Sequence, residues 1–333
     1  MSYDATVIRR ASARLESRRR QRERELAARR EELYRKLPRL AELDGALRKT
    51  LVRIARAALS SQGNPEGHLN AIRAENGRLQ SERAQLLEQA GYPPDILDDK
   101  PDCLRCGDTG RKNGELCGCL KKLCAEEQIR ELSKLLDLGE QSFERFSLEW
   151  YPDAYDPAIG KSPRQNMKLV SDFCREYARR FGSFPFANLF LTGSTGLGKT
   201  FLSACIARMV SEQGYSVVYD TAGNIFSAFE SQKFARDTEA ARDARDETHR
   251  YLNCDLLILD DLGAELTTPF VQSALYQLVN SRLLAGKRTV ISSNLSMDEV
   301  RKKYTPQIAS RLEGEYRVLP FFGQDIRLLR RPG

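Results

Sequence analysis

The chain has 333 residues, of which 41% are hydrophobic and 30% are charged, so it can bury one sizeable core and still carry a polar extension. No stretch reaches the roughly 18 uninterrupted apolar residues of a membrane helix, and no apolar segment follows the arginines near the N-terminus. This pattern excludes a membrane span and a secretion signal, and predicts a cytoplasmic protein without a membrane partner. The formal net charge of +7 permits an anionic partner but does not identify one.

The N-terminal region is basic and helical in pattern. Residues 1–60 contain fifteen Arg and two Lys against eight acidic residues, so the rest of the chain is close to neutral. Apolar residues recur at steps of three and four between Leu33 and Ile54, which predicts a stripe along one helix face. Pro38 interrupts it and predicts a kink or two helices. The arginines can neutralise nucleic-acid phosphates, yet the interleaved glutamates are equally typical of a solvated helix face.

A Gly, Asn and Pro cluster at residues 60–67 predicts a turn, and the apolar spacing from Leu69 to Leu87 predicts a second amphipathic helix. Two antiparallel helices, or a coiled coil, fit this pattern best. Residues 1–95 are therefore expected to form a basic helical arm or helical hairpin.

Five of the eight cysteines lie between Cys103 and Cys124, which suggests a metal site and not disulfides in a chain without a secretion signal. Four of them form two close pairs: Cys103, Cys106, Cys117 and Cys119. Four thiolates at this spacing suit a structural Zn²⁺, although the second pair has only one intervening residue. Cys124 is a possible substitute ligand, and an iron–sulfur centre or reduced thiols are the alternatives. Residues 96–140 are expected to hold this zinc module and a linker helix at 126–136.

Beyond about residue 163, apolar strands alternate with helices, the pattern of a parallel sheet covered on both faces. Residues 141–333 are expected to form this α/β domain. The predicted strands lie at 188–192, 216–221, 255–260, 288–293 and 317–322.

A phosphate-binding loop follows the first of these strands and precedes a helix. It consists of Gly193, Ser194, Thr195, Gly196, Leu197, Gly198, Lys199 and Thr200. The glycines let backbone N–H groups converge on phosphates, the lysine adds a positive charge, and the Thr200 hydroxyl can ligate Mg²⁺. Strand, loop, Gly-Lys-Thr and helix coincide, so ATP is the expected cofactor.

The apolar run at residues 256–259 is too uniform for a half-exposed strand and belongs in the centre of the sheet. Asp260 and Asp261 follow it, at the strand end where parallel sheets bind ligands. We expect Asp260 to bind Mg²⁺, and Asp261, on the other strand face, to act as the base for the attacking water.

From Cys103 to the C-terminus the chain resembles the DnaC and DnaI type of helicase loaders among the AAA+ ATPases, whose relatives include the IstB-type transposition ATPases. The matching segments are 143–151, 193–200, 260–263 with Glu265, 293–294, 308–312 and 323–327. The resemblance implies that Asn294 is sensor 1, that Arg311 is an arginine finger, and that Arg327 is sensor 2. An Asn closing a strand is also a common turn former, and Arg311 can equally serve in a salt bridge.

By this resemblance, the expected function is ATP-dependent loading of a hexameric replicative helicase onto single-stranded DNA, by a self-oligomer assembled through Arg311. The cysteine cluster favours this hypothesis, because DnaI-type loaders resemble the chain in carrying a zinc module. Two rivals remain: an IstB-like transposition helper that binds duplex DNA, and a nucleotide-gated scaffold with negligible turnover.

Overall fold

The computed structural model describes residues 3–59, 65–136, 141–157, 160–234 and 238–329. The chain forms two compact units. The first, here called the hairpin unit, is Ala13–Cys117, and the second, the sheet unit, comprises Met1–Ser12 and Gly118–Gly333. Among the described helices, none combines the length and the apolar composition that crossing a membrane requires.

Two helices of the hairpin unit follow the predicted apolar stripe. Helix α1 (Ala5–Lys36) ends just before Pro38, which begins α2 (Pro38–Leu59). A proline is well suited to the first position of a helix, where its missing N–H has no intrahelical partner. The two-helix alternative is therefore the correct one.

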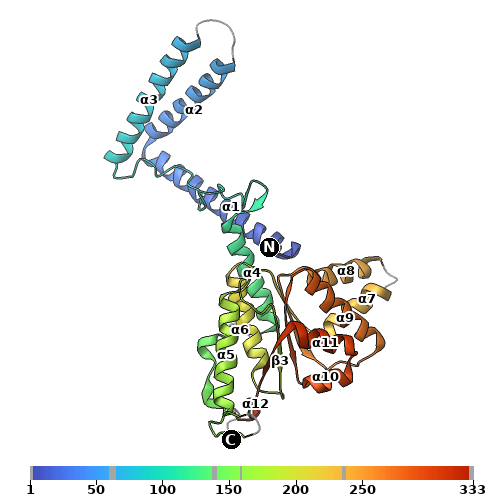
Figure 1. Ribbon diagram of the computed structural model, residues 1–333. Helices are drawn as coiled ribbons and strands as arrows, with labels where there is room; N and C mark the ends of the chain where they lie inside the picture. Colours follow the sequence, from blue (N-terminus) through green and yellow to red (C-terminus); the bar gives the residue numbers. More distant parts are fainter. Residues whose placement is uncertain (1–2, 60–64, 137–140, 158–159, 235–237, 330–333) are drawn as a thin grey trace. The chain divides into compact units, whose positions relative to one another are not determined.

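Helices α2 and α3 (Pro65–Gln89) lie side by side (Figure 1). Three ion pairs join them: Arg39–Glu82, Arg83–Asp44 and Arg53–Glu75. The partner's number in α3 is 82 or 83 for residues 39 and 44 of α2 but 75 for residue 53, so the helices are antiparallel, as predicted. Buried leucines complete this core, namely Leu33, Leu40, Leu87 and Leu97. Of the predicted turn at 60–67, residues 60–64 lie outside the described residues, whereas residues 65–67 belong to the first turn of α3.

The sheet unit contains a five-stranded sheet in the order β4-β5-β6-β3-β7, in which every neighbouring pair is parallel. Its strands are β3 (Asn188–Thr192), β4 (Val217–Thr221), β5 (Leu256–Leu262), β6 (Arg288–Ser293) and β7 (Tyr316–Pro320). The accompanying helices are α4 (Gly118–Leu135), α5 (Pro163–Arg179), α6 (Lys199–Glu212), α7 (Ala222–Phe234), α8 (Thr238–Asn253), α9 (Pro269–Leu284), α10 (Met297–Lys303), α11 (Pro306–Glu315) and α12 (Ile326–Leu329).

Helices cover both faces of this sheet, as Figure 1 shows for α5 and α6 on one side of β3 and α9 and α11 on the other. Successive side chains of each strand point to opposite faces of the sheet, so the sheet unit has one core on each face. Leu189 and Leu191 of β3 face the core that includes α5 and α6, whereas Phe190 faces the core that includes α7 and α9. The predicted α/β class, with a parallel sheet between two helical layers, is confirmed.

The strand predictions hold within two residues at each end. Strands β3 and β6 have the predicted bounds, whereas β5 continues to Leu262 and β7 ends at Pro320, two residues before the predicted end. Helix α4 begins at Gly118, well before the predicted start at residue 126, because Leu120, Leu123 and Cys124 already bury one face of its first turns.

The first residues of the chain pack in the sheet unit, which the composition did not reveal. Tyr3 and Val7 are buried, and the Tyr3 hydroxyl donates to the carbonyl of Lys121 on α4 at 3.4 Å. Arg250 of α8 pairs with Asp4 at 3.3 Å. Residues 3–12 therefore pack as part of the sheet unit, although they begin the basic helix α1.

Candidate nucleotide site and thiol cluster

The Gly-rich loop connects β3, which lies between β6 and β7, to the first turn of α6. Two glycines have backbone geometry that a side chain would not permit. At Gly193, with φ of 144°, an added Cβ would lie 2.4 Å from the carbonyl oxygen of Phe321. At Gly198, the N-cap of α6 with φ of 88°, it would lie 3.0 Å from the Tyr151 hydroxyl. A bare backbone at the N-terminus of a helix suits the binding of phosphate oxygens.

Lys199 is buried at the centre of this loop. Its ammonium donates to the carbonyls of Gly193 and Ser194 at 2.6 and 2.8 Å, and to Oδ1 of Asn294 at 2.7 Å. Burial lowers the pKa of Lys199, and the carboxylates of Asp261 and Asp260 oppose that shift without cancelling it. The ammonium is thus held in a partly desolvated position by neutral oxygens. Phosphate oxygens are stronger hydrogen-bond acceptors than these neutral oxygens.

The carboxylate of Asp260, at the end of β5, is surrounded by hydroxyl groups. Its Oδ2 atom accepts hydrogen bonds from Thr200 Oγ1 at 3.1 Å and from the Tyr219 hydroxyl at 2.6 Å, and its Oδ1 accepts one from Ser292. Asp260 is only 2% exposed. A hydroxyl and a carboxylate oxygen in direct contact are the oxygen ligands that Mg²⁺ takes beside a phosphate-binding loop.

Asp261 reaches the same site through a β-bulge. The register between β5 and β6 shifts between Leu259 and Leu262, and Asp261 takes the left-handed conformation with φ of 58°. Its N–H donates to Ser292 Oγ at 3.1 Å, which holds the bulge in place. Strand alternation alone places Asp261 on the opposite face, as we expected from the sequence. The bulge instead puts it in the wall of the cavity that contains the Gly-rich loop.

The electrostatics of Asp261 differ from those of a surface carboxylate. Burial, and then the nearby Asp260 carboxylate, raise the pKa of Asp261, while Lys199 and Arg327 oppose the rise. A carboxylate with a raised pKa is a stronger proton acceptor than an ordinary aspartate.

The cavity has a volume of about 320 Å³ and brings together most of the predicted site. The predicted residues in its wall are Thr195, Gly196, Leu197, Gly198, Lys199, Thr200, Asp261, Asn294 and Arg327. Asp260 lies just beneath, bonded to Thr200. Arg311 is on α11, half-buried and outside this wall.

The opposite wall consists of residues to which the sequence analysis gave no role. Phe146, Trp150 and Tyr151 line it, in the segment that holds two short 3-10 helices, η1 (Phe143–Arg145) and η2 (Leu148–Trp150). The Tyr151 hydroxyl donates to the carbonyl of Leu197 at 2.9 Å and so attaches this wall to the loop. Three aromatic residues within six positions were the available signal, because nucleotide bases stack on apolar and aromatic surfaces.

The C-terminal segment also contacts the loop. The N–H of Ile326 donates to the carbonyl of Gly196 at 3.0 Å, and an added Cβ on Gly196 would overlap the Asp325 carboxylate. Helix α12, which carries Arg327, is thereby attached to the phosphate-binding loop. The glycine cradle, the ammonium and the hydroxyl–carboxylate pair fit a magnesium nucleotide.

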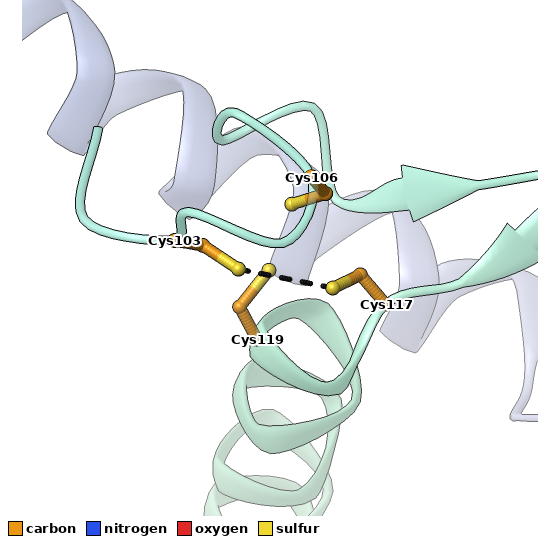
Figure 2. Close-up of side chains that lie close together, drawn as sticks. All are labelled: Cys103, Cys106, Cys117 and Cys119. Atoms are coloured by element: carbon orange, nitrogen blue, oxygen red, sulfur yellow. Dashed lines mark hydrogen bonds between the residues drawn. The ribbon is translucent and has the colours of Figure 1, made fainter. Parts of the chain in front are cut away.

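In the second candidate site the four predicted thiols converge (Figure 2): Cys103, Cys106, Cys117 and Cys119. Their sulfur atoms all lie within 4.8 Å of one another, and those of Cys103 and Cys117 are 3.8 Å apart. Four sulfurs about 2.3 Å from a tetrahedral Zn²⁺ lie about 3.8 Å apart. The donor set and its spacing therefore fit such an ion.

Local backbone geometry brings the thiols together. The N–H groups of Cys106 and Gly107 both donate to the carbonyl of Cys103, which forms a tight turn around the first pair. Two short antiparallel strands, β1 (Arg111–Lys112) and β2 (Glu115–Leu116), then lead to the second pair. Asn113 and Gly114 connect them, both with positive φ, which is the preferred two-residue hairpin turn. The Asn-Gly pair was the signal in the sequence for this hairpin.

Asp108 stabilises the first turn. Its buried carboxylate accepts hydrogen bonds from the N–H of Cys103 at 2.8 Å and from the Arg22 guanidinium. Burial by itself would raise the pKa of Asp108, but these hydrogen bonds lower it overall.

Cys124 is not in the group of four. It is buried on α4, and burial together with Glu127 raises the pKa of its thiol to about 11, as expected for a protonated core cysteine.

The chain is similar to several known proteins. Residues 184–312 match the family model for IstB-like ATP binding proteins. The replicative helicase loader DnaC of Escherichia coli K12 is 25% identical over 138 residues, which cover 41% of this chain and 54% of that protein. The replicative helicase loader DnaI of Bacillus subtilis is 29% identical over 142 residues, or 41% of each chain. The crystal structure of the DnaC helicase loader aligns with a TM-score of 0.41 and 18% identity, over 54% of this chain and 98% of that chain.

A phosphate-binding loop after an internal parallel strand, with carboxylates at the end of the next strand but one, defines an ATP-binding P-loop domain of the AAA+ class. Within this class, the sheet unit is similar to the DnaC-type AAA+ proteins. The chain spans about half the length, or less, of the relatives it matches.

Replacement of Lys199 by Ala is expected to weaken the binding of magnesium ATP about a hundred-fold or more, because each charge-assisted hydrogen bond to phosphate contributes roughly 1.5–3 kcal/mol. Isothermal titration calorimetry with a non-hydrolysable ATP analogue measures this loss. Lys287→Ala is the control, since that ammonium pairs with Asp255 away from the cavity. Equal affinity in Lys199→Ala and wild type would contradict the assignment of the loop.

Replacement of Cys106 by Ser is expected to abolish the one metal ion per chain that we predict for the thiol cluster, because a serine hydroxyl is a poor ligand for Zn²⁺. Elemental analysis of protein purified without chelator measures the metal content. The matched control is Cys124→Ala, which removes a buried thiol outside the cluster and should retain the ion. Wild-type protein that carries no metal would refute the site.

Proposed function

We propose that this protein is an ATP-dependent loader that places a hexameric replicative helicase on single-stranded DNA. The observation that carries the proposal is the cavity in which Lys199, Asp261 and Asn294 meet, together with a four-thiol cluster ahead of the same domain. The similarity to two proteins named replicative helicase loaders supports the substrate class.

The site residues divide the chemistry of ATP hydrolysis among themselves. The loop amides and Lys199 bind the phosphates, while Thr200 and Asp260 hold Mg²⁺, which neutralises charge on the phosphate oxygens when bound. Asp261 accepts a proton from the attacking water, and its raised pKa suits that role. Asn294 positions this water. Arg327, on α12, binds phosphate oxygens from the side of the C-terminal segment.

Arg311 completes the site of a neighbouring copy. It lies outside its own cavity, and within the described part of the chain it forms no ion pair. A guanidinium is ionised at every relevant pH and can stabilise charge on several phosphate oxygens at once. Each ATP site then lies between two subunits, and the working form is an oligomer.

The rest of the chain supplies the contacts with the helicase. We assign residues 1–95 to a basic helical arm, residues 96–140 to a four-cysteine zinc module with its helix, and residues 141–333 to the AAA+ domain. A zinc ion held by these four thiols would be structural, because they would fill its tetrahedral coordination and leave no position open for chemistry. The arm holds the helicase while the AAA+ domain contacts single-stranded DNA and resets the complex by hydrolysis.

A second candidate is a transposition helper that binds duplex DNA, which the match to IstB-like ATP binding proteins favours. The two functions predict different partners. A loader binds its host's replicative helicase and increases the amount of helicase on single-stranded DNA. A transposition helper coats or bends duplex DNA in an ATP-dependent manner and has no helicase contact.

Asp261→Asn is expected to bind ATP like the wild type but to hydrolyse it at least about a hundred-fold more slowly, because a general base contributes roughly 10²–10⁴-fold to the rate. Asn also tolerates the left-handed backbone at this position, so the fold should persist. Single-turnover hydrolysis and nucleotide titration measure the two properties separately. Full biological activity of this variant would instead support a nucleotide-gated scaffold.

Arg311→Ala is expected to leave ATP binding unchanged and to reduce hydrolysis in the assembled protein by about a thousand-fold, the scale of an arginine finger supplied in trans. Helicase loading on single-stranded DNA should fall with it. Arg317→Ala is the control, since Arg317 is exposed on β7 and stacks over Phe186. The loader proposal fails if the wild-type protein neither binds the helicase with ATP nor changes its loading.

A further inference from the structure

Tyr219 contacts the carboxylate that we assign to magnesium, but it has so far been given no role of its own. It lies on β4, which is paired with β5, and its register partner there is Ile258. Its hydroxyl donates to Oδ2 of Asp260 at 2.6 Å, the same oxygen that accepts from Thr200. Tyr219 is not among the described residues that line the nucleotide cavity. It therefore acts on the site only through Asp260.

The direction of this hydrogen bond is fixed. A carboxylate has no hydrogen to donate, so the Tyr219 hydroxyl is the donor. Ser292 donates to the other carboxylate oxygen, so the Asp260 side chain is held from β4 and from β6 at once. Its carboxylate plane is fixed as a result.

We propose that Tyr219 is a positioning residue for magnesium: its hydroxyl holds the Asp260 carboxylate in the orientation that lets Thr200 and Asp260 bind the ion together. The proposal rests on the proposed function, because it concerns the metal of the same nucleotide site. Partners that orient a metal ligand typically change metal affinity by roughly ten- to a hundred-fold when they are removed. A phenol that donates to a buried ligand oxygen is such a partner.

The test is Tyr219→Phe, which keeps the ring and removes only the hydroxyl. Binding of Mn²⁺ to the complex with a non-hydrolysable ATP analogue, followed by electron paramagnetic resonance, should weaken about ten-fold. Affinity for the same analogue in excess EDTA should match the wild type, because Tyr219 does not contact the nucleotide cavity. Thermal unfolding checks that the variant remains folded.

The matched control is Tyr251→Phe. The Tyr251 hydroxyl donates to Oδ2 of Asp220 at 2.7 Å, so this variant removes a Tyr–Asp hydrogen bond at the next residue of β4 but away from Asp260. Wild-type metal affinity in Tyr251→Phe and a ten-fold loss in Tyr219→Phe support the proposal. Equal metal affinity in Tyr219→Phe and wild type overturns it, as does an equal loss in both variants, which would indicate a general effect on β4. Wild-type protein that binds no metal–nucleotide complex would instead refute the proposed function itself.

Discussion

The ammonium of Lys199 joins the parts of the nucleotide site. It bonds to two carbonyls of its own loop and to Asn294, which follows β6, so a single charged group connects two neighbouring strand ends. The order of the sheet makes this possible, because β3 and β6 are adjacent although about a hundred residues separate them in sequence. The two carboxylates near the end of β5 then balance the charge electrostatically. The site is therefore ordered by hydrogen bonds from Lys199 to neutral oxygens. The phosphate oxygens of a nucleotide can replace these acceptors and form stronger hydrogen bonds.

Much of the fold was predictable, since it depends on local signals. The five strands, their parallel arrangement and the loop at residues 193–200 follow from apolar runs and from glycine chemistry. The antiparallel pairing of α2 and α3 followed from apolar periodicity and one proline. What the sequence could not supply was the set of contacts between distant segments. The aromatic wall at Phe146, Trp150 and Tyr151, and the bond from Ile326 to Gly196, require the chain to return to the loop in three dimensions.

In the thiol cluster, too, the local features were predictable from the sequence and a contact with a distant segment was not. Spacing alone identified its four ligands, because both pairs are close in sequence. The buried carboxylate of Asp108, which shapes the first turn, receives a hydrogen bond from Arg22 of α1, 86 residues earlier in the chain. An arginine among many in a basic helix gives no signal of such a contact. Its role in the cluster became visible only from the folded chain.

At the bulge that carries Asp261, β5 has one more residue than the part of β6 opposite it. The bulge therefore depends on residue number and not on residue type. No side-chain replacement at position 261 can therefore restore a regular ladder between the two strands, since the extra backbone unit remains. Removing that one residue would leave Leu262 opposite Ser293 in a regular ladder and would take the second carboxylate out of the strand. The position of the second carboxylate therefore depends on the length of β5 relative to β6 as well as on the residue type at position 261.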